Sequence, residues 1–224
     1  MSASTARRSW RAWLMATLVA AAGAVLLGGC GISPQRQGNV QVLPMQLSAH
    51  DLQRGGLAFL TPSSATGQEE DRQALALTFY AVFTKVRPQL RVVSLPATLT
   101  AINGAGLGKT YRDMLEDYRA TGLLERKTLS RIGELTGVRY LALLKLAGFK
   151  QESKGRWGTF GLRVLDTKVT TMRIYMQLWD AQTGAVVWEA SAESVTAFDS
   201  INEDTVSFQA AVEETARWLI DTLP

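Results

Sequence analysis

The first thirty residues set the strongest constraint on what this chain can fold into. They have a basic start, an apolar stretch from Ala12 to Leu27, and at their end Cys30, the only cysteine of the 224 residues. The apolar stretch is shorter than the ~20 residues that a membrane-spanning helix needs. We therefore interpret residues 1–29 as an export signal that is cleaved. A single cysteine excludes an intramolecular disulfide, and the remaining chain is long enough for one globular domain with its own core.

The end of this segment reads Leu27-Gly28-Gly29-Cys30 and resembles the bacterial lipoprotein box, a leucine and two small residues before a cysteine. The resemblance implies that the Cys30 thiol receives a diacylglycerol, and that the amine freed by cleavage is acylated, as by palmitate. Three acyl chains exceed the two signals usually needed for stable anchoring. Gly31 stands where an aspartate would favour the inner membrane. The resemblance therefore implies the periplasmic face of the outer membrane, with the protein on the membrane and not across it.

The overall charge argues against a nucleic-acid partner. The formal net charge is +4, with 24 basic and 20 acidic residues. Three of the basic residues, Arg7, Arg8 and Arg11, lie in the export signal, which holds no acidic residue. The mature chain is therefore nearly neutral, which does not fit a general polyanion-binding protein.

The mature chain is expected to consist of a tether and one domain. Residues 30–50 contain glycine, serine and proline, few charges and no sustained period, so we predict a lipidated cysteine followed by a flexible tether that reaches up to ~50 Å. Residues 51–224 alternate between strand and helix patterns. Strands are predicted at 57–60, 90–95, 140–146, 172–179 and 185–193, and helices at 69–87, 107–122, 128–137 and 204–223. This order favours an α/β domain, a mixed sheet with helices packed on it.

Two segments carry a resemblance to a known family. Residues 125–143 form a helix pattern that ends in Gly137 before an apolar strand, and residues 176–188 form a strand, an Asp-Ala-Gln-Thr-Gly turn and a strand with Trp188. This pattern looks like the family of the curli secretion lipoprotein, the lipoprotein activators of peptidoglycan synthases and the N-terminal domain of TolB. The resemblance covers residues 55 to 222 and implies the fold. It does not imply a task, because the members share topology while their partners differ.

In residues 103–110, Gly108-Lys109-Thr110 matches the end of a nucleotide-binding loop, but the spacing of the glycines does not match that motif. A Walker A loop needs a glycine where this chain has Asn103. We therefore expect no nucleotide partner and interpret the segment as a loop that leads into a helix.

The sequence offers no constellation for catalysis. His50, the only histidine, lies in the predicted tether, and Cys30 is consumed by lipid. The acids Glu69, Glu70 and Asp71 are explained by the helix macrodipole at a helix start. We therefore predict a protein that is not an enzyme and has no metal site and no cofactor.

The stretch from 151 to 168 is the most unusual part of the domain. It is glycine-rich and joins two strands, and its candidate interaction residues are Lys154, Arg156, Trp157, Phe160 and Arg163. Exposed aromatic and cationic side chains of this kind are typical of contact surfaces for a protein, a glycan or an anionic lipid. A solvated loop or an extended hairpin is an equally good interpretation. A membrane pore is disfavoured because Arg163, Asp166 and Lys168 interrupt any lipid-facing stripe.

These features favour a non-catalytic outer-membrane lipoprotein that acts as an assembly factor, adaptor or regulator of a cell-envelope machine. Its expected partners are the membrane, through the lipid anchor, and an envelope protein or a second copy of itself. One alternative is a ring-forming subunit of a secretion or polysaccharide-export system. Another is a periplasmic hydrolase of cell-wall glycan.

Replacing the box cysteine tests the lipoprotein prediction. Cys30→Ser removes the only thiol that can accept a diacylglycerol, so we expect unprocessed or mislocalised precursor on immunoblots of cell fractions. A Cys30→Ser protein that is cleaved at the same site and remains membrane-bound would contradict the prediction.

Overall fold

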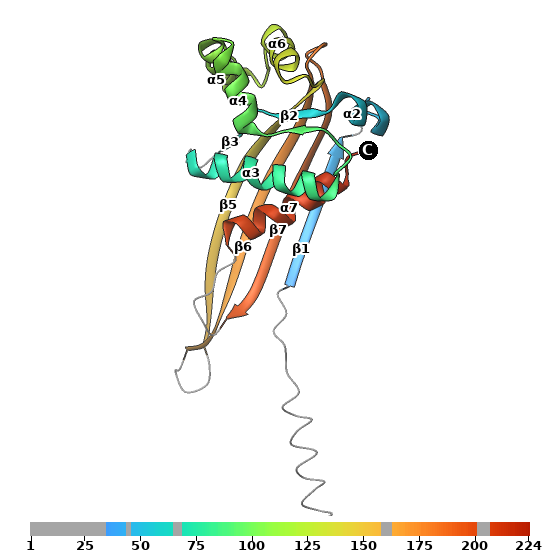
Figure 1. Cartoon of the computed structure of the whole chain (residues 1–224). Coiled ribbons are helices and arrows are strands. Elements are labelled where there is room, and N and C mark those ends of the chain that lie inside the picture. The colour runs from blue at the N-terminus through green and yellow to red at the C-terminus, as the bar shows by residue number, and fades with distance from the viewer. Residues whose placement is uncertain (1–34, 44–45, 65–68, 158–162, 201–206) are drawn as a thin grey trace, which may run out of the picture. The chain divides into compact units, whose positions relative to one another are not determined.

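A mixed sheet with helices on both faces organises the chain (Figure 1). The computed structural model describes residues 35–43, 46–64, 69–157, 163–200 and 207–224. The strands are β1 (Gln35–Leu43), β2 (Leu57–Phe59), β3 (Ser63–Ser64), β4 (Val92–Val93), β5 (Tyr140–Trp157), β6 (Arg163–Asp180) and β7 (Val186–Ser200). The helices are α2 (Ala49–Gly55), α3 (Glu69–Val86), α4 (Leu95–Gly104), α5 (Gly108–Thr121), α6 (Arg126–Thr136) and α7 (Phe208–Asp221). The predicted fold class is confirmed.

The described strands follow the order β1-β7-β6-β5-β2-β4, and β3 pairs with β5 beside this path. Strands β1, β7, β6 and β5 are antiparallel neighbours, whereas β2 runs parallel to both β5 and β4. The short parallel strands therefore extend one side of a long antiparallel ladder.

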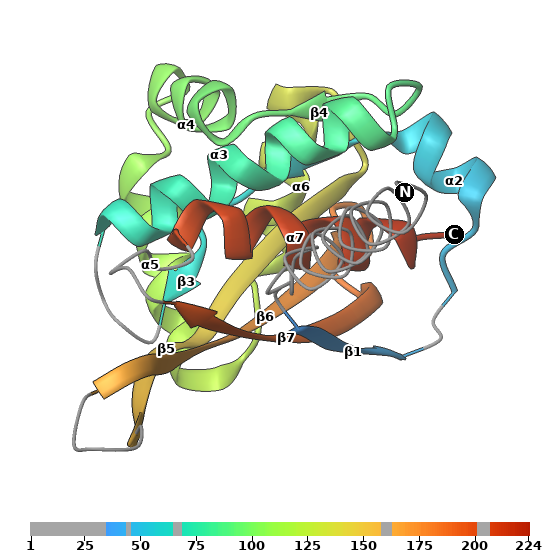
Figure 2. The ribbon, with the colours of Figure 1, turned by 90° about the horizontal axis from the view of Figure 1, so that it is seen from below.

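Two hydrophobic cores hold the helices against the sheet. Helices α3 and α7 pack on one face, and seen from below they lie on the same side of the long strands (Figure 2). Helices α4, α5 and α6 pack on the other face around β2 and the first residues of β5. Among the described helices, none is long and apolar enough to cross a membrane.

The predicted periodicities of the main elements are confirmed. In α3, Leu75, Phe79 and Phe83 are fully buried, as their spacing along one helix face requires. In β6, Met172, Ile174, Met176 and Leu178 are fully buried and alternate with more exposed side chains. Helix α6 ends at Gly137, which adopts φ 67° as the predicted helix stop.

The turn between β6 and β7 is fixed by a buried carboxylate. Asp180 Oδ1 accepts hydrogen bonds from the backbone N–H groups of Gln182 at 2.8 Å and Thr183 at 3.3 Å. Its Oδ2 accepts from Arg139 Nε at 2.9 Å and Nη2 at 2.7 Å. The Asp180 side chain is only 3% exposed, so the Arg139 guanidinium supplies the charge partner that burial demands.

The prediction of a buried strand over residues 90–95 is wrong in its extent. Only Val92 and Val93 form a strand, and both are partly exposed. Helix α4 starts at Leu95, with Ser94 as its N-cap and Pro96 in its first turn. A proline is tolerated there because the first helical N–H groups have no intrahelical acceptor. Pro96 therefore starts a helix that the sequence analysis missed and does not merely stop a strand.

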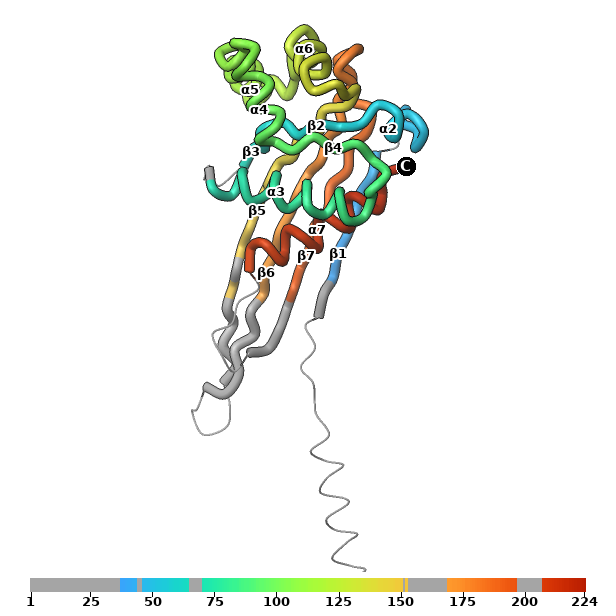
Figure 3. Tube along the Cα trace, in the orientation of Figure 1, coloured from blue at the N-terminus to red at the C-terminus, as the bar shows by residue number. Residues whose placement is uncertain are grey.

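The prediction of a flexible tether over residues 30–50 is also wrong for most of its length. Residues Gln35–Leu43 form β1, which pairs antiparallel with β7 from Gln35↔Ala197 to Leu43↔Glu189. Figure 3 shows β1 running beside β7. Ala49–Gly55 then form α2. The described fold accordingly begins with β1 at Gln35 and not at residue 51. The sequence concealed β1 because its partner strand lies near the other end of the chain.

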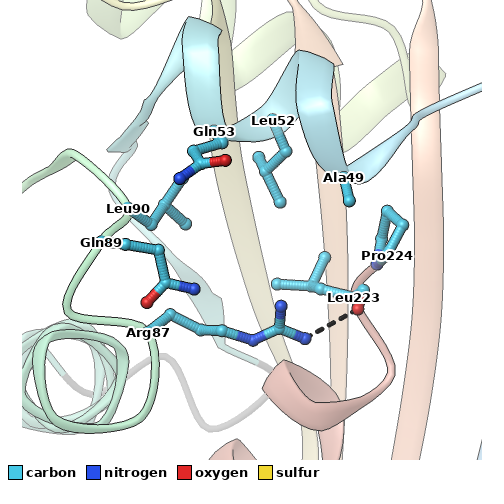
Figure 4. Close-up of a pocket in the computed structure, with 8 residues that line it drawn as sticks. All are labelled: Ala49, Leu52, Gln53, Arg87, Gln89, Leu90, Leu223 and Pro224. Carbon is cyan, nitrogen blue, oxygen red and sulfur yellow. Dashed lines mark hydrogen bonds between the residues drawn. The ribbon is translucent and has the colours of Figure 1, made fainter.

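A small pocket of about 80 Å³ lies where α2, the end of α3 and the C-terminus meet (Figure 4). Arg87 lies at its edge and donates through Nη2 to the carbonyl oxygens of Leu223 at 2.8 Å and Ile220 at 3.3 Å. A cation at the last carbonyls of α7 also interacts favourably with the helix dipole. We therefore assign Arg87 a structural role, which is to attach the end of α7 to α3.

Gly38 lets β1 dock on α7, and its replacement tests that contact. A Cβ added at Gly38 would lie 2.1 Å from Trp218 Cζ3, closer than any real contact. We expect Gly38→Ala to destabilise the domain by about 1–3 kcal/mol through overpacking, measured by chemical denaturation. The control is Asn39→Ala on the opposite, exposed side of β1. Equal stability of the two variants would contradict this packing.

Candidate functional site

One face of the sheet carries polar side chains in a continuous array, which we call the open face. It is opposite to the face covered by α3 and α7, and in the view from below no described helix lies over it at β1 and β7 (Figure 2). The strand registers place the same side of each strand in this array. Its polar members are Lys145, Lys150 and Glu152 of β5, Arg173, Tyr175 and Gln177 of β6, Glu189, Ser191 and Glu193 of β7, and Gln37, Asn39 and Gln41 of β1.

A hydrogen-bond network fixes the part of the open face that lies next to α5. Gln177 Oε1 accepts from the Tyr118 hydroxyl at 3.1 Å and from Trp179 Nε1 at 3.3 Å. Gln177 Nε2 donates to Glu189 Oε2 at 2.8 Å. The rings of Tyr118 and Trp179 meet edge to face with centroids 6.5 Å apart. Because each group has a partner, the side chains of this region are held in one arrangement.

Charges of both signs lie on the open face. Glu189 and Glu193 lie on β7 and Arg173 lies on β6, whereas β5 carries Lys145 and an ion pair between Lys150 and Glu152. Arg173 pairs with Glu193 across the strands through Nε at 2.9 Å and through Nη2, and this bond raises the pKa of Arg173. Charges held in fixed positions favour a partner whose own charges are complementary to them.

A hollow of about 560 Å³ lies at the β3 side of the open face. Four separate segments form it: β3, the start of α3, the end of α5 and the middle of β5. Ser63 and Lys145 are register partners in the β3–β5 pairing, which places both on the wall that the sheet provides. The lining residues are Ser63, Ser64, Arg72, Tyr118, Arg119, Gly122 and Lys145.

Most site residues predicted from the sequence lie outside the described part of the chain. This holds for Leu27, Gly28, Gly29 and Cys30 of the lipoprotein box and for Phe160 of the candidate loop. The backbone is described for the others: Lys154, Arg156 and Trp157 belong to β5, and Arg163 is the first residue of β6.

The stretch from 151 to 168 is largely strand and not loop. β5 continues to Trp157, β6 begins at Arg163, and the two pair along this length with an irregularity between Arg156 and Trp157. The extended-hairpin interpretation is the one that the backbone supports. The glycines that suggested a loop concealed the strand pattern, because glycine has low strand propensity.

The residues weighed for other chemistry have ordinary surroundings. Lys109 lies in the first turn of α5 and donates to Asp113 Oδ2 at 2.5 Å, which is an exposed helical pair of one turn's spacing. His50 is exposed on α2. Among the described residues, no three His, Cys, Asp or Glu side chains lie close enough to hold a metal ion.

The open face and the hollow are the functional candidates that sequence reasoning missed. The alternation of Arg173, Tyr175 and Gln177 in β6 did indicate one polar strand face. The hollow left no such signal, because its side chains come from four segments that only the fold brings together.

No protein-family model and no curated protein matches the chain. Solved structures with a similar course include the PelC dodecamer of Paraburkholderia phytofirmans, at 15% identity and TM-score 0.41, covering 84% of this chain and 97% of that one. The LpoB C-terminal domain of Salmonella enterica is 15% identical with TM-score 0.38, and covers 62% and 82%. Lipoprotein GNA1162 of Neisseria meningitidis is 11% identical with TM-score 0.40, and covers 75% and 96%. Likenesses of this extent do not show what this chain binds.

Alkaline titration tests the network around Tyr118. Burial raises the pKa of Tyr118, and the nearby Glu189 carboxylate raises it further. Because the folded-state pKa exceeds the unfolded value of ~10, this contribution to stability is complete below pH ~10 and is lost as the pH rises through the folded-state pKa. We therefore expect the unfolding free energy to fall above pH ~10, and less steeply in Tyr118→Phe.

Two further results sharpen this test. Below pH ~10, Tyr118→Phe should lose about 0.5–1.5 kcal/mol for the missing hydrogen bond. Glu189→Gln should lower the Tyr118 pKa, measured by tyrosinate absorbance. A Tyr118→Phe protein with the wild-type alkaline slope would show that Tyr118 does not contribute.

Proposed function

We propose that the protein is a non-catalytic lipoprotein of the cell envelope, anchored through Cys30 on the periplasmic face of the outer membrane, and that it acts as an adaptor for a protein partner. The observation that carries the proposal is the position of the lipoprotein box, which ends five residues before the first strand of the domain. The partner surface in this proposal is the open face.

The short connection between anchor and domain limits where the domain can lie. Five residues from Cys30 to Gln35 span at most about 17 Å, even when fully extended. In the proposal, the end of the sheet where β1 starts therefore stays close to the lipid.

The strand registers indicate which end of the sheet this is. Gln35 pairs with Ala197, Ala197 with Val169, and Val169 with Glu152, so these four residues lie at one level of the sheet. β5 and β6 continue beyond this level to Trp157 and Arg163. The strands of the hairpin therefore extend past the start of β1, the point of the sheet that follows Cys30 in the sequence. In this proposal, the candidate residues Lys154, Arg156, Trp157, Phe160 and Arg163 act near the membrane surface, where basic and aromatic residues are favoured.

The open face supports a protein partner. Its groups are polar and partly exposed, and several of them are fixed by neighbouring partners. Pre-ordered polar groups bind with a smaller loss of side-chain entropy than mobile ones. Such a surface suits a protein with a complementary charge pattern.

Self-association is a second candidate, favoured by β1. This strand lies at one edge of the sheet, has nine residues, and carries Arg36 as its only charged residue. An edge strand with few charges and no proline is a template for pairing with another strand. A second copy joined there would extend the sheet and leave the open face uncovered.

Photocrosslinking in cells tests the adaptor role. A photoreactive benzoylphenylalanine replaces Tyr175 on the open face, and in a matched control it replaces Lys127, which is exposed on α6. We expect a crosslinked protein adduct at position 175, its loss on adding Arg173→Glu, and no such adduct at position 127. An adduct of the protein with itself at position 175 would place a second copy on the open face and would contradict both the adaptor role and pairing through β1, which leaves this position uncovered. Equal adducts at both positions, or none at 175, would contradict the proposal.

A further inference from the structure

We propose that the hollow at the β3 side of the open face is a binding site for a phosphate group. The inference goes beyond the adaptor role, since it depends on neither the lipid anchor nor a protein partner. It rests on the cations that line the hollow, on a buried hydroxyl that has no partner, and on the volume.

The hollow gathers positive charge from three elements. Arg72 comes from the first turns of α3, Arg119 from the last turn of α5, and Lys145 from the middle of β5. In the described part of the chain, Arg119 and Lys145 form no ion pair, whereas Arg72 is engaged in a further interaction. Two cations at this hollow therefore keep their charge available for an anion.

Lys145 is the cation that the fold explains least. Arg119 has a structural reason for its position, because a cation in the last turn is favoured by the helix dipole. Lys145 has no such reason, since it interrupts the run of buried side chains from Tyr140 to Leu146 in β5. Its strand neighbours in register are Ser63 and Tyr175, neither of which has a carboxylate to pair with Lys145.

The hydroxyl groups complete the donor set. Ser63 Oγ is buried and has no hydrogen-bond partner in the described part of the chain. A buried hydroxyl without a partner loses hydration, and a ligand oxygen at the hollow would restore a hydrogen bond. Ser63 also shares its register position with Lys145, so the two can act on one anion.

The nearest carboxylates of the open face do not compete for these cations. Glu189 is held by Gln177 Nε2 at 2.8 Å, and Glu193 is paired with Arg173. Guanidinium, ammonium and hydroxyl donors around one space are the groups that bind phosphate oxygens in proteins. At about 560 Å³ the hollow is much larger than the ion, which leaves room for the organic part of a phosphate ester.

Calorimetric titration of the full-length protein in an uncharged detergent tests this site. The probes are inorganic phosphate and, as a soluble lipid headgroup, dihexanoylphosphatidylglycerol. We expect saturable binding of at least one probe, weakened about tenfold or more in Lys145→Gln and in Arg119→Gln, because charge-assisted hydrogen bonds are lost. Lys145→Arg should retain binding. The matched control, Lys127→Gln, removes one exposed positive charge on α6 and should bind like the wild type.

The outcomes separate the ligand sources and the proposals. Binding of both probes or of the lipid headgroup alone identifies a phospholipid as a source, and binding of inorganic phosphate alone indicates a phosphate group in solution. No saturable binding of either probe, or equal weakening in Lys127→Gln, would overturn the phosphate site. None of these binding results changes the expected crosslink at position 175, so the adaptor role is tested independently of the phosphate site.

Discussion

The rest of the structure depends on the antiparallel ladder of β5, β6 and β7. Its strands bury one set of alternate side chains under α3 and α7, and leave the other set to form the open face. Because the side-chain period of a strand is two, a slip of one residue in either pairing would exchange these sets. The Asp180 turn with its Arg139 partner fixes the β6–β7 register at one end. The position of the open face is thus set by the same contacts that form the core.

The two faces of this ladder carry different kinds of side chain. The covered face supplies burial: Met172, Ile174 and Met176 lose all contact with water there. The opposite face supplies fixed polar groups, among them Gln177, which is held by both Tyr118 and Glu189. The side chains of the hydrophobic core and those of the proposed partner surface therefore alternate along the same strands. A substitution on the open face can change binding while the core remains intact.

The sequence predicts the fold to the extent that its signals are local. The spacing of Leu75, Phe79 and Phe83, the stop at Gly137 and the turn at Asp180 are encoded within a few residues, and the structure agrees with them. β1 could not be predicted, because its pattern is weak and its partner β7 lies far along the chain. The hollow could not be predicted either, since no single segment contains its donor set. The start of α4 at Leu95 could not be predicted from Pro96, because proline is found both after strands and in the first turn of helices.

The pairing of β1 with β7 also has a consequence for the order in which the chain folds. Residues 35–43 are synthesised early, whereas their partners, residues 189–197, are synthesised about 150 residues later. Contacts of such large sequence separation form slowly. Until β7 is available, β1 has both edges unpaired and is open to pairing with other chains. In the proposed lipoprotein, β1 begins five residues after the acylated Cys30, so the segment next to the lipid would be among the last to reach its final pairing.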